Sequence, residues 1–385
     1  MVGAVGDLVT NEEYNLVAVD VNKVFGDKYP TAAVTDANRI ATHKFGWGAV
    51  NIADALVDGT LITAERLQEL VSRTNISINH TDLTDNVLVF AIPANRTTIS
   101  AGTAIRAEDL NLVRTKFNTV ILNNKHLTID ATNASAFNAT STGYERTTTW
   151  NNQLNGEHKF EWADYNSARY FFNGGGQLRV ALNMTSGSTA GYYNWSDVIN
   201  EMGVLNFNWD TMTQSAATTS GTSEGKGFYD LTANYGDGSD TNTNEGLLFT
   251  SSGVTLGRKV GTYGYGSYGY GYGYITGPGN YPGWADPAII GGSYSSTIYV
   301  SAYSAYSTYQ QLKFKIYGKY INNGAGVQFK MVLDDTTHNN FVDGTITPTV
   351  SYLMPDTLTI GTTSFDVTPA PTFAIVNDFT SIDDY

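Results

Sequence analysis

Three consecutive glycines, Gly174 to Gly176, separate a pair of phenylalanines from the clearest β-strand pattern in this chain. From residue 177 to residue 184, large apolar side chains occupy every second position and alternate with Gln, Arg, Ala and Asn, which is the period of a half-buried strand. The glycines predict either a positive φ or a close backbone approach that other residues resist. Nothing in this segment carries chemistry, so it indicates a structural role and favours a fold organised around a β-sheet.

The C-terminal third repeats this alternation. Apolar residues occupy every second position in 298–302, 312–317 and 327–333, and an Asn-Gly signal within 322–326 predicts a hairpin turn between the last two segments. Consecutive strands joined by tight turns are typical of antiparallel sheets. We therefore expect an antiparallel sandwich rather than alternating strands and helices.

Two more elements of the sandwich follow from local patterns. The alternation from Ile346 to Tyr352 includes Pro348, which cannot donate a hydrogen bond in a ladder and so predicts an edge strand. In 194–203, four apolar residues from Trp195 to Met202 share one helical face, and Gly203 is the expected stop. The sequence thus predicts one short helix packed on the sheet.

Residues 1–130 have a different, helical periodicity. Thr10 and Glu13 form a candidate capping box, followed by apolar residues at helical spacing from Tyr14 to Val24. Similar apolar stripes begin at Leu67 and at Leu110. The three starts, 6–12, 59–65 and 102–108, share a Gly, an aliphatic and a Glu at equal offsets. Two interpretations stay open: a recurring start signal within one small helical domain, or three ordinary N-caps with acidic first turns.

A polar stretch at 131–160, densest in 133–143, predicts a linker or long connection. The expected fold class is therefore α+β. A small helical N-terminal domain at 1–130 is followed by an antiparallel β-sandwich at 131–385 with one short packed helix. Between the first two helical stripes, the turn from Phe45 to Gly48 suggests either a core anchor or a surface loop that a partner grips, and we favour the anchor.

Composition excludes several classes of function. The net charge of −14 disfavours nucleic acid and anionic membrane surfaces as partners. No cysteine is present, so disulfides, thiol nucleophiles and cysteine-bound zinc are impossible. No apolar run is long enough for membrane insertion, and the N-terminus lacks the pattern of a signal peptide. We expect a protein made and assembled in a cytoplasm.

Candidate chemistry is weak, and we expect neither catalysis nor a cofactor. The five histidines have no metalloprotease spacing, and nucleophile-elbow and phosphate-loop motifs do not occur. Asp334 and Asp335 resemble half of a glycosidase pair, but a solvated turn is the preferred interpretation. The polar segment Asp237–Glu245 has oxygen ligands in alternation, although its glycine is misplaced for a calcium loop. An ordinary polar loop is preferred there, and calcium binding stays open.

A Tyr-Gly repeat dominates 261–284, where glycine at every second position argues for a loop rather than a strand. Its aromatic density suggests either stacking on sugars or burial against a neighbouring subunit, and composition does not separate the two. The candidate binding residues are Tyr263, Tyr265, Tyr268, Tyr270, Tyr272, Tyr274, Tyr281 and Trp284.

The chain resembles virion structural proteins of tailed phages, especially those infecting cyanobacterial and other marine hosts. The resemblance rests on four blocks, the last containing a Val-Asp-Gly-Thr motif: Phe45–Gly48, Val57–Ala64, Ser167–Arg179 and Val342–Val350. A Trp-led helix such as 194–203 also follows the third block in that family. The blocks are short but span most of the chain, whereas the Tyr-Gly repeat lies outside them.

The resemblance implies a non-enzymatic component of the tail, neck or baseplate, such as an appendage or fibre, with no catalytic residues to transfer. Its partners would be other virion proteins, and we expect a homo-oligomer, with a trimer as the working number. The helical domain is the expected attachment site, with the candidates Tyr14, Phe45, Trp47, Leu67 and Phe117. The alternative is a receptor-binding protein that recognises host surface glycan through the Tyr-Gly repeat.

Overall fold

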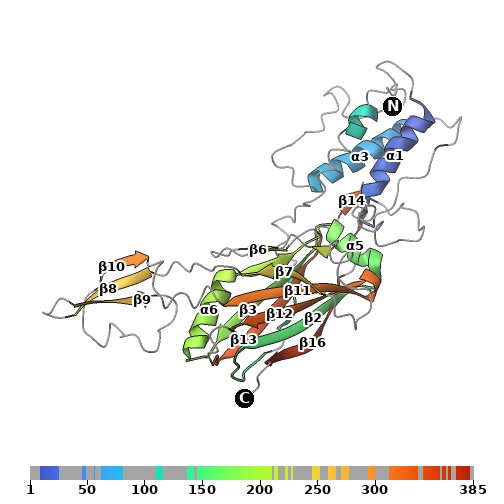
Figure 1. The fold of residues 1–385 in the computed structure, drawn as a ribbon. Helices are drawn as coiled ribbons and strands as arrows, with labels where there is room; N and C mark the ends of the chain where they lie inside the picture. The colour runs from blue at the N-terminus through green and yellow to red at the C-terminus, as the bar shows by residue number, and fades with distance from the viewer. Residues whose placement is uncertain are drawn as a thin grey trace.

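A computed structural model describes the main helices of the N-terminal domain and most of the sandwich. The described residues are 9–25, 46–48, 56, 62–80, 110–115, 137–142, 145–209, 212–215, 222–223, 227–228, 245–251, 259–265, 270–276, 294–299, 312–336, 341–355, 358–360, 363–365 and 370–381. They form a helical unit, a β-sandwich and a separate three-stranded sheet (Figure 1). The expected α+β class with a β-sandwich is confirmed. No helix among these residues has the length and apolarity to span a membrane.

The helical unit is built on α1 (Asn11–Phe25) and α3 (Ala64–His80), with a further helical segment at 110–115. The capping box of α1 is confirmed, because the Thr10 N–H donates to Glu13 Oε2 at 2.9 Å and the Glu13 N–H donates to Thr10 Oγ1 at 3.2 Å. At the start of α3, Thr63 Oγ1 accepts the corresponding N-cap hydrogen bond from the Arg66 N–H at 3.4 Å, with an arginine in the place of Glu13. Two of the three predicted starts therefore share a threonine N-cap, and the third lies outside the described residues.

One sheet of the sandwich has five strands in the order β1-β13-β3-β4-β5. Their bounds are Phe137–Thr142, Thr345–Leu353, Gln177–Thr185, Val204–Phe207 and Met212–Ser215. The other sheet has six strands in the order β16-β2-β12-β11-β7-β6. Their bounds are Thr372–Ser381, Gln153–Glu161, Gly326–Asp334, Lys313–Ile321, Gly246–Thr250 and Thr222–Ser223. All pairings in both sheets are antiparallel.

The predicted alternation places the apolar side chains between the sheets. In β3 and β2, every second side chain is buried, as a two-residue period requires. Phe207 of β4 and Phe329 of β12 meet edge to face with ring centroids 5.1 Å apart, so the two sheets share one core. The β11–β12 hairpin turns at Asn322–Gly324, where all three residues have positive φ, as the Asn-Gly signal predicts.

Two helices close the sandwich: α5 (Tyr165–Asn173) and α6 (Ala190–Met202). In α6, the predicted apolar face is confirmed, since the four residues Trp195, Val198, Ile199 and Met202 are all buried. Thr189 caps its N-terminus and Gly203, with φ 68°, ends it. Figure 1 shows α6 lying along β3 and α5 facing the helical unit.

Arg146 closes one edge of the sandwich. Its backbone exchanges two hydrogen bonds with Ile346 of β13, of 3.0 and 2.9 Å. Its buried guanidinium donates to the Phe379 carbonyl of β16 at 2.8 Å. Arg146 therefore connects one strand of each sheet by hydrogen bonds. No local sequence pattern predicts this connection.

The edge-strand prediction for Pro348 is wrong. β13 lies between β1 and β3, and Pro348 pairs with Leu182 of β3. The register with β1 ends at the pair Thr142–Thr349, so proline stands one residue beyond that ladder. A strand with neighbours on both sides tolerates proline there because β1 has already stopped, and no N–H is needed at that position.

The prediction of a connection across 131–160 is also wrong in part. This polar stretch contains β1 and most of β2. Ladder hydrogen bonds use backbone groups, so an Asn-, Ser- and Thr-rich segment forms a strand when a neighbouring strand is present. β1 takes the outermost position of its sheet.

The Tyr-Gly repeat is not a loop over its first part. It forms β8 (Lys259–Tyr265) and β9 (Tyr270–Thr276), which pair with β10 (Tyr294–Tyr299) in the order β10-β8-β9. Strand pairing uses the backbone, and alternation of Tyr and Gly matches the two-residue period of a strand. A further two-stranded sheet, β14 (Leu358–Ile360) with β15 (Thr363–Phe365), lies beside α3.

Candidate interaction surfaces

A reciprocal pair of hydrogen bonds joins the helical unit to the sandwich. The Trp47 Nε1–H donates to the Asn173 carbonyl at 3.1 Å, and Asn173 Nδ2 donates to the Gly46 carbonyl at 3.0 Å. Both side chains are buried. Because buried polar groups are costly to leave unpaired, the two bonds fix the turn against the C-terminal end of α5.

Packing on both sides reinforces this contact. The Trp47 ring meets Phe25 of α1 edge to face, with centroids 5.0 Å apart. Gly48 has φ 73°, and a Cβ there would lie 2.6 Å from the Tyr170 ring of α5. The preferred interpretation of the aromatic turn as a core anchor is thus confirmed. We call the contacts of Gly46, Trp47 and Gly48 with Tyr170 and Asn173 the 47–173 clasp.

Three of the five attachment candidates from the sequence are not surface residues. Tyr14, Trp47 and Leu67 lie in the core of the helical unit, so as contact residues for a partner they are wrong. They were chosen for aromatic or aliphatic character at helical spacing, which marks a core as readily as an interface. Phe45 and Phe117 lie outside the described residues.

The outer face of α1 offers a different apolar pair. Leu16 and Val19 are 41% and 53% exposed, although the opposite stripe of the same helix is fully buried. Residues three apart on a helix are neighbours on its surface. The sequence analysis did not identify this pair. The signal was present in the sequence, because Leu16 and Val19 are apolar residues on the otherwise polar side of the helix.

Asp343, in the Val-Asp-Gly-Thr block, ties β13 to the start of α6. Its carboxylate accepts hydrogen bonds from the backbone and hydroxyl groups of Ser188 and Thr189, at 2.7 to 3.0 Å. Partial burial favours the neutral acid, but these hydrogen bonds outweigh it and hold the pKa of Asp343 below its usual value. Gly344, with φ 96°, follows with no room for a Cβ beside the Thr185 carbonyl. The block therefore has a structural role, because it holds β13 against the start of α6.

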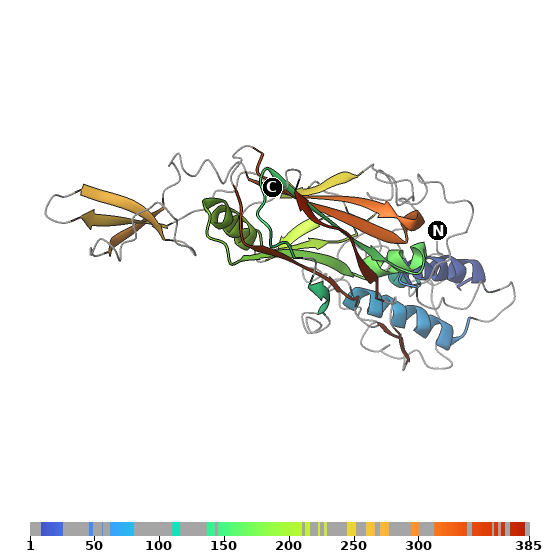
Figure 2. The same cartoon turned by 90° about the horizontal axis from the view of Figure 1, so that it is seen from below.

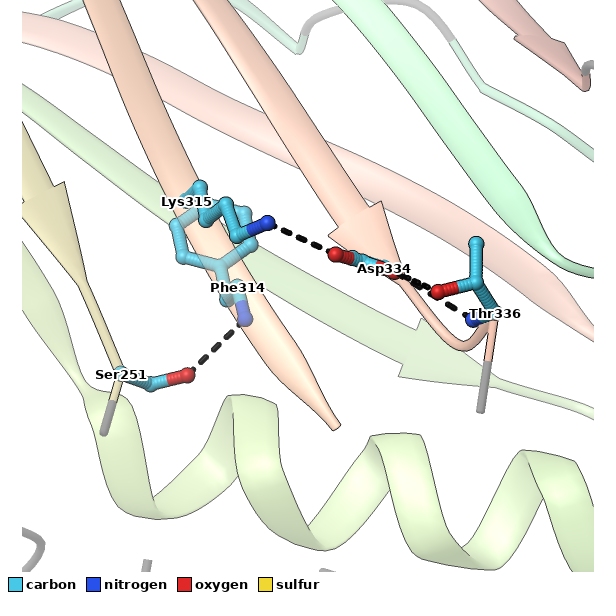
Figure 3. Close-up of polar contacts among 5 residues, drawn as sticks. All are labelled: Ser251, Phe314, Lys315, Asp334 and Thr336. Carbon is cyan, nitrogen blue, oxygen red and sulfur yellow. Dashed lines mark hydrogen bonds and ion pairs between the residues drawn. The ribbon is translucent and has the colours of Figure 1, made fainter. Parts of the chain in front are cut away.

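Asp334 and Asp335 face different environments rather than forming a pair. Asp334 accepts hydrogen bonds from Lys315 Nζ at 2.7 Å and from the Thr336 hydroxyl at 2.7 Å (Figure 3). Just beyond the end of β7, Ser251 Oγ accepts a hydrogen bond from the Phe314 N–H of β11 at 2.9 Å. Burial alone would raise the pKa of Asp334, but its hydrogen bonds with Lys315 and Thr336 lower it.

Asp335 lies in the core beside Trp195. Burial raises its pKa to about 7, despite an opposing interaction with the Trp195 side chain. Successive residues at a strand end point to opposite sides. The Asp334 carboxylate is bound to Lys315 and Asp335 is only 1% exposed, so the two groups do not flank a common open site as a glycosidase pair does.

The described residues give no support to a metal site. Within the described part of the chain, no group of three acidic or histidine side chains is placed to hold an ion. Residues 237–244 of the calcium candidate lie outside it, and Glu245 accepts a hydrogen bond from Lys330 Nζ at 2.6 Å. His158 is buried among Phe160, Phe329 and Phe373, and burial lowers its pKa to about 3.

The tyrosine candidates divide between described and undescribed residues. The strands contain Tyr263, Tyr265, Tyr270, Tyr272 and Tyr274, and the register pairs Tyr263 with Tyr272 and Tyr265 with Tyr270. Tyr268, Tyr281 and Trp284 lie outside the described residues.

Comparison of the chain with protein-family models, with curated proteins and with solved structures finds no match.

Proposed function

We propose that this protein is a non-enzymatic structural component of a tailed-phage virion, acting by assembly with other virion proteins. The observation that carries the proposal is the 47–173 clasp. It joins the Phe45–Gly48 block to the Ser167–Arg179 block, two of the segments on which the resemblance rests. A third, Val342–Val350, clasps α6 through Asp343. The polar groups of these three segments hydrogen-bond to other parts of the chain and hold its elements together, as expected of a structural protein.

The helical unit is the proposed attachment end, and the outer face of α1 is its contact surface. Leu16 and Val19 form an apolar pair on an otherwise polar face. Burial of exposed aliphatic side chains against another protein favours association in proportion to the apolar area covered. The place of assembly is the host cytoplasm, and the tail, neck and baseplate are the candidate positions in the particle.

The test is incorporation into particles assembled with a variant chain. Leu16→Asp with Val19→Asp places two charges in the proposed contact while leaving the buried stripe of α1 intact. We expect the number of copies per particle, measured by quantitative mass spectrometry of purified particles, to fall at least tenfold.

The matched control is Ile375→Asp with Val376→Asp on β16. These adjacent residues are 42% and 38% exposed, close to the exposure of the α1 pair. We expect wild-type incorporation from this variant. Equal incorporation of both variants would exclude α1 as the attachment surface, and absence of the wild-type chain from particles would refute the virion role itself.

The glycan-binding alternative assigns its function to the Tyr-Gly strands. Binding of the purified chain to an array of host glycans, lost when the tyrosines of 263–274 are replaced, would support this alternative, and a chain that binds no glycan would exclude it.

A further inference from the structure

β16 lies at an edge of the six-stranded sheet and leads to the C-terminus, drawn dark red in Figures 1 and 2. Its ladder with β2 is irregular on both sides of Asn377. All four side chains of 375–378 are exposed, and Phe379 is the one buried side chain among those described in this strand. By contrast, β12 pairs regularly along its whole length with both neighbours. Few buried contacts and irregular pairing favour local opening, so β16 is the long strand of this sheet that is most readily released.

Two anchors hold β16 against the rest of the sandwich. Near its start, Phe373 packs against Phe160 of β2, with ring centroids 5.6 Å apart. Near its end, Phe379 enters the sandwich core, and its carbonyl accepts the hydrogen bond from the buried Arg146 guanidinium at 2.8 Å. Because this bond is made to the backbone of β16, the Arg146 side chain acts as a latch on the strand.

We infer that copies of this chain exchange β16, so that the strand of one copy pairs with β2 of a neighbouring copy. Release of β16 leaves the outer backbone groups of β2 without partners, and such an edge pairs readily with another strand. Exchange of an identical element between copies is a low-cost route to an oligomer, because the contacts of the closed chain are remade in the exchanged one. This goes beyond the proposed function and can be tested without the particle.

The β16 strand of a second copy is the occupant that fits the released edge. The closed chain already shows this sequence placing Phe373 beside Phe160 and the Phe379 carbonyl on Arg146. The connection at 366–371 spans about 20 Å when fully extended, so exchange requires neighbouring copies. Within one chain, the effective concentration of the strand at β2 is of the order of 1 mM, and exchange becomes appreciable as the protein approaches that concentration.

The experiment traps β16 on β2 with a disulfide in the purified full-length chain. Lys159→Cys with Ala374→Cys puts cysteines at directly opposite positions of the two strands, where the Cα separation suits a disulfide, and the chain has no other cysteine. After oxidation, a closed chain stays at 41.7 kDa on a non-reducing gel, whereas exchanged chains become covalently joined. We expect roughly a tenth of the protein in covalent oligomers after oxidation at about 100 μM, and under about 1% at about 1 μM.

The control pair of cysteines lies in the middle of the other sheet. Ala181→Cys with Thr349→Cys joins β3 to β13 at directly opposite positions, and these residues are half-buried, as Lys159 and Ala374 are. Because β3 and β13 each have neighbours on both sides, the control disulfide should close only within one chain. Accidental collisions between surface cysteines would link both variants equally.

Arg146→Ala, added to the first cysteine pair, tests the latch. Arg146 holds β16 equally in the closed and exchanged forms, so its loss should leave the final fraction of covalent oligomers unchanged. Opening should become easier, and that fraction should be reached at least about tenfold faster after the protein is concentrated. Internal disulfides alone at about 100 μM, with and without Arg146→Ala, would overturn the inference. Equal cross-linking of the control pair, or a covalent fraction independent of protein concentration, would overturn it as well.

Discussion

At the scale of single residues, neighbouring carboxyl groups of this protein have opposite effects on stability. Asp334 is ionised and bonded to Lys315, whereas Asp335 is buried beside Trp195 and has a pKa near 7. An acid whose pKa is raised by folding binds a proton more tightly in the folded state than in the unfolded state. Folding stability therefore falls as pH rises from about 4, the unfolded pKa, to about 7.

Asp335→Asn should remove this loss of stability. The variant is expected to resemble the wild type near pH 4 and to become more stable than it by up to about 4 kcal/mol at pH 8. Denaturant unfolding at a series of pH values measures the difference. A constant difference across pH 4–8 would show that Asp335 keeps its ordinary pKa in the folded chain.

Asp334→Asn is the matched comparison, and its expected effect on folding stability has the opposite sign. A lowered pKa stabilises the fold above pH 4, and that contribution is lost as pH falls through the folded value. The variant should lose about 1 kcal/mol or less at pH 7, because its ion pair is partly exposed. The same unfolding series should show the deficit shrinking toward acid pH.

At the scale of elements, the glycine run after α5 is a helix-ending motif. The Gly176 N–H donates to the Phe171 carbonyl at 2.8 Å and the Gly175 N–H donates to the Phe172 carbonyl at 3.1 Å. These are the two hydrogen bonds of the Schellman motif. Gly175 has φ 99°, and a Cβ on Gly176 would lie 2.7 Å from the Phe171 carbonyl oxygen. Both reasons for glycine that the sequence suggested, positive φ and close approach, are therefore confirmed, at adjacent residues.

Alanine substitutions across this run should differ although the residues are consecutive. Gly174 has φ −75°, which alanine adopts freely, so Gly174→Ala should change the free energy of unfolding by under about 0.5 kcal/mol. Gly175→Ala should cost about 1–2 kcal/mol, because an L-residue is strained at positive φ. Thermal unfolding of the two variants checks the order, and equal costs would argue against the Schellman ending.

At the scale of the whole molecule, the 47–173 clasp couples two hydrophobic cores. The core around α1 and α3 and the core between the sheets are separate clusters. Trp47 belongs to the first and bonds to Asn173, which ends α5 of the second. Because the connection is buried and its hydrogen bonds are reciprocal, we expect the two parts to unfold together.

Trp47→Ala should separate them. Removing a buried tryptophan costs about 3–5 kcal/mol and leaves the Asn173 amide without its Gly46 acceptor held in place. Calorimetry is expected to show one unfolding transition in the wild type and two in the variant, the helical unit melting first. Asn173→Ala keeps the Trp47 ring and should produce a milder separation. A single transition in Trp47→Ala would mean that contacts elsewhere join the two parts.

The sequence by itself determined the elements with a strong local signal. The alternation in 177–184, 312–317 and 327–333, the Thr10–Glu13 capping box and the apolar face of 194–203 all matched the structure. Each depends on periodicity or on hydrogen bonds within a few residues, which the chain encodes locally. The α+β class followed from these elements.

Only the tertiary structure decided which residues meet. Pro348 became internal because β1 covers part of its strand, and the Tyr-Gly repeat became a sheet because β8, β9 and β10 pair. Trp47 and Asn173, 126 residues apart, found each other across two cores. Strand order and side-chain partnership depend on contacts distant in sequence. Local patterns therefore predicted the strands and helices of this protein, while packing placed its surfaces.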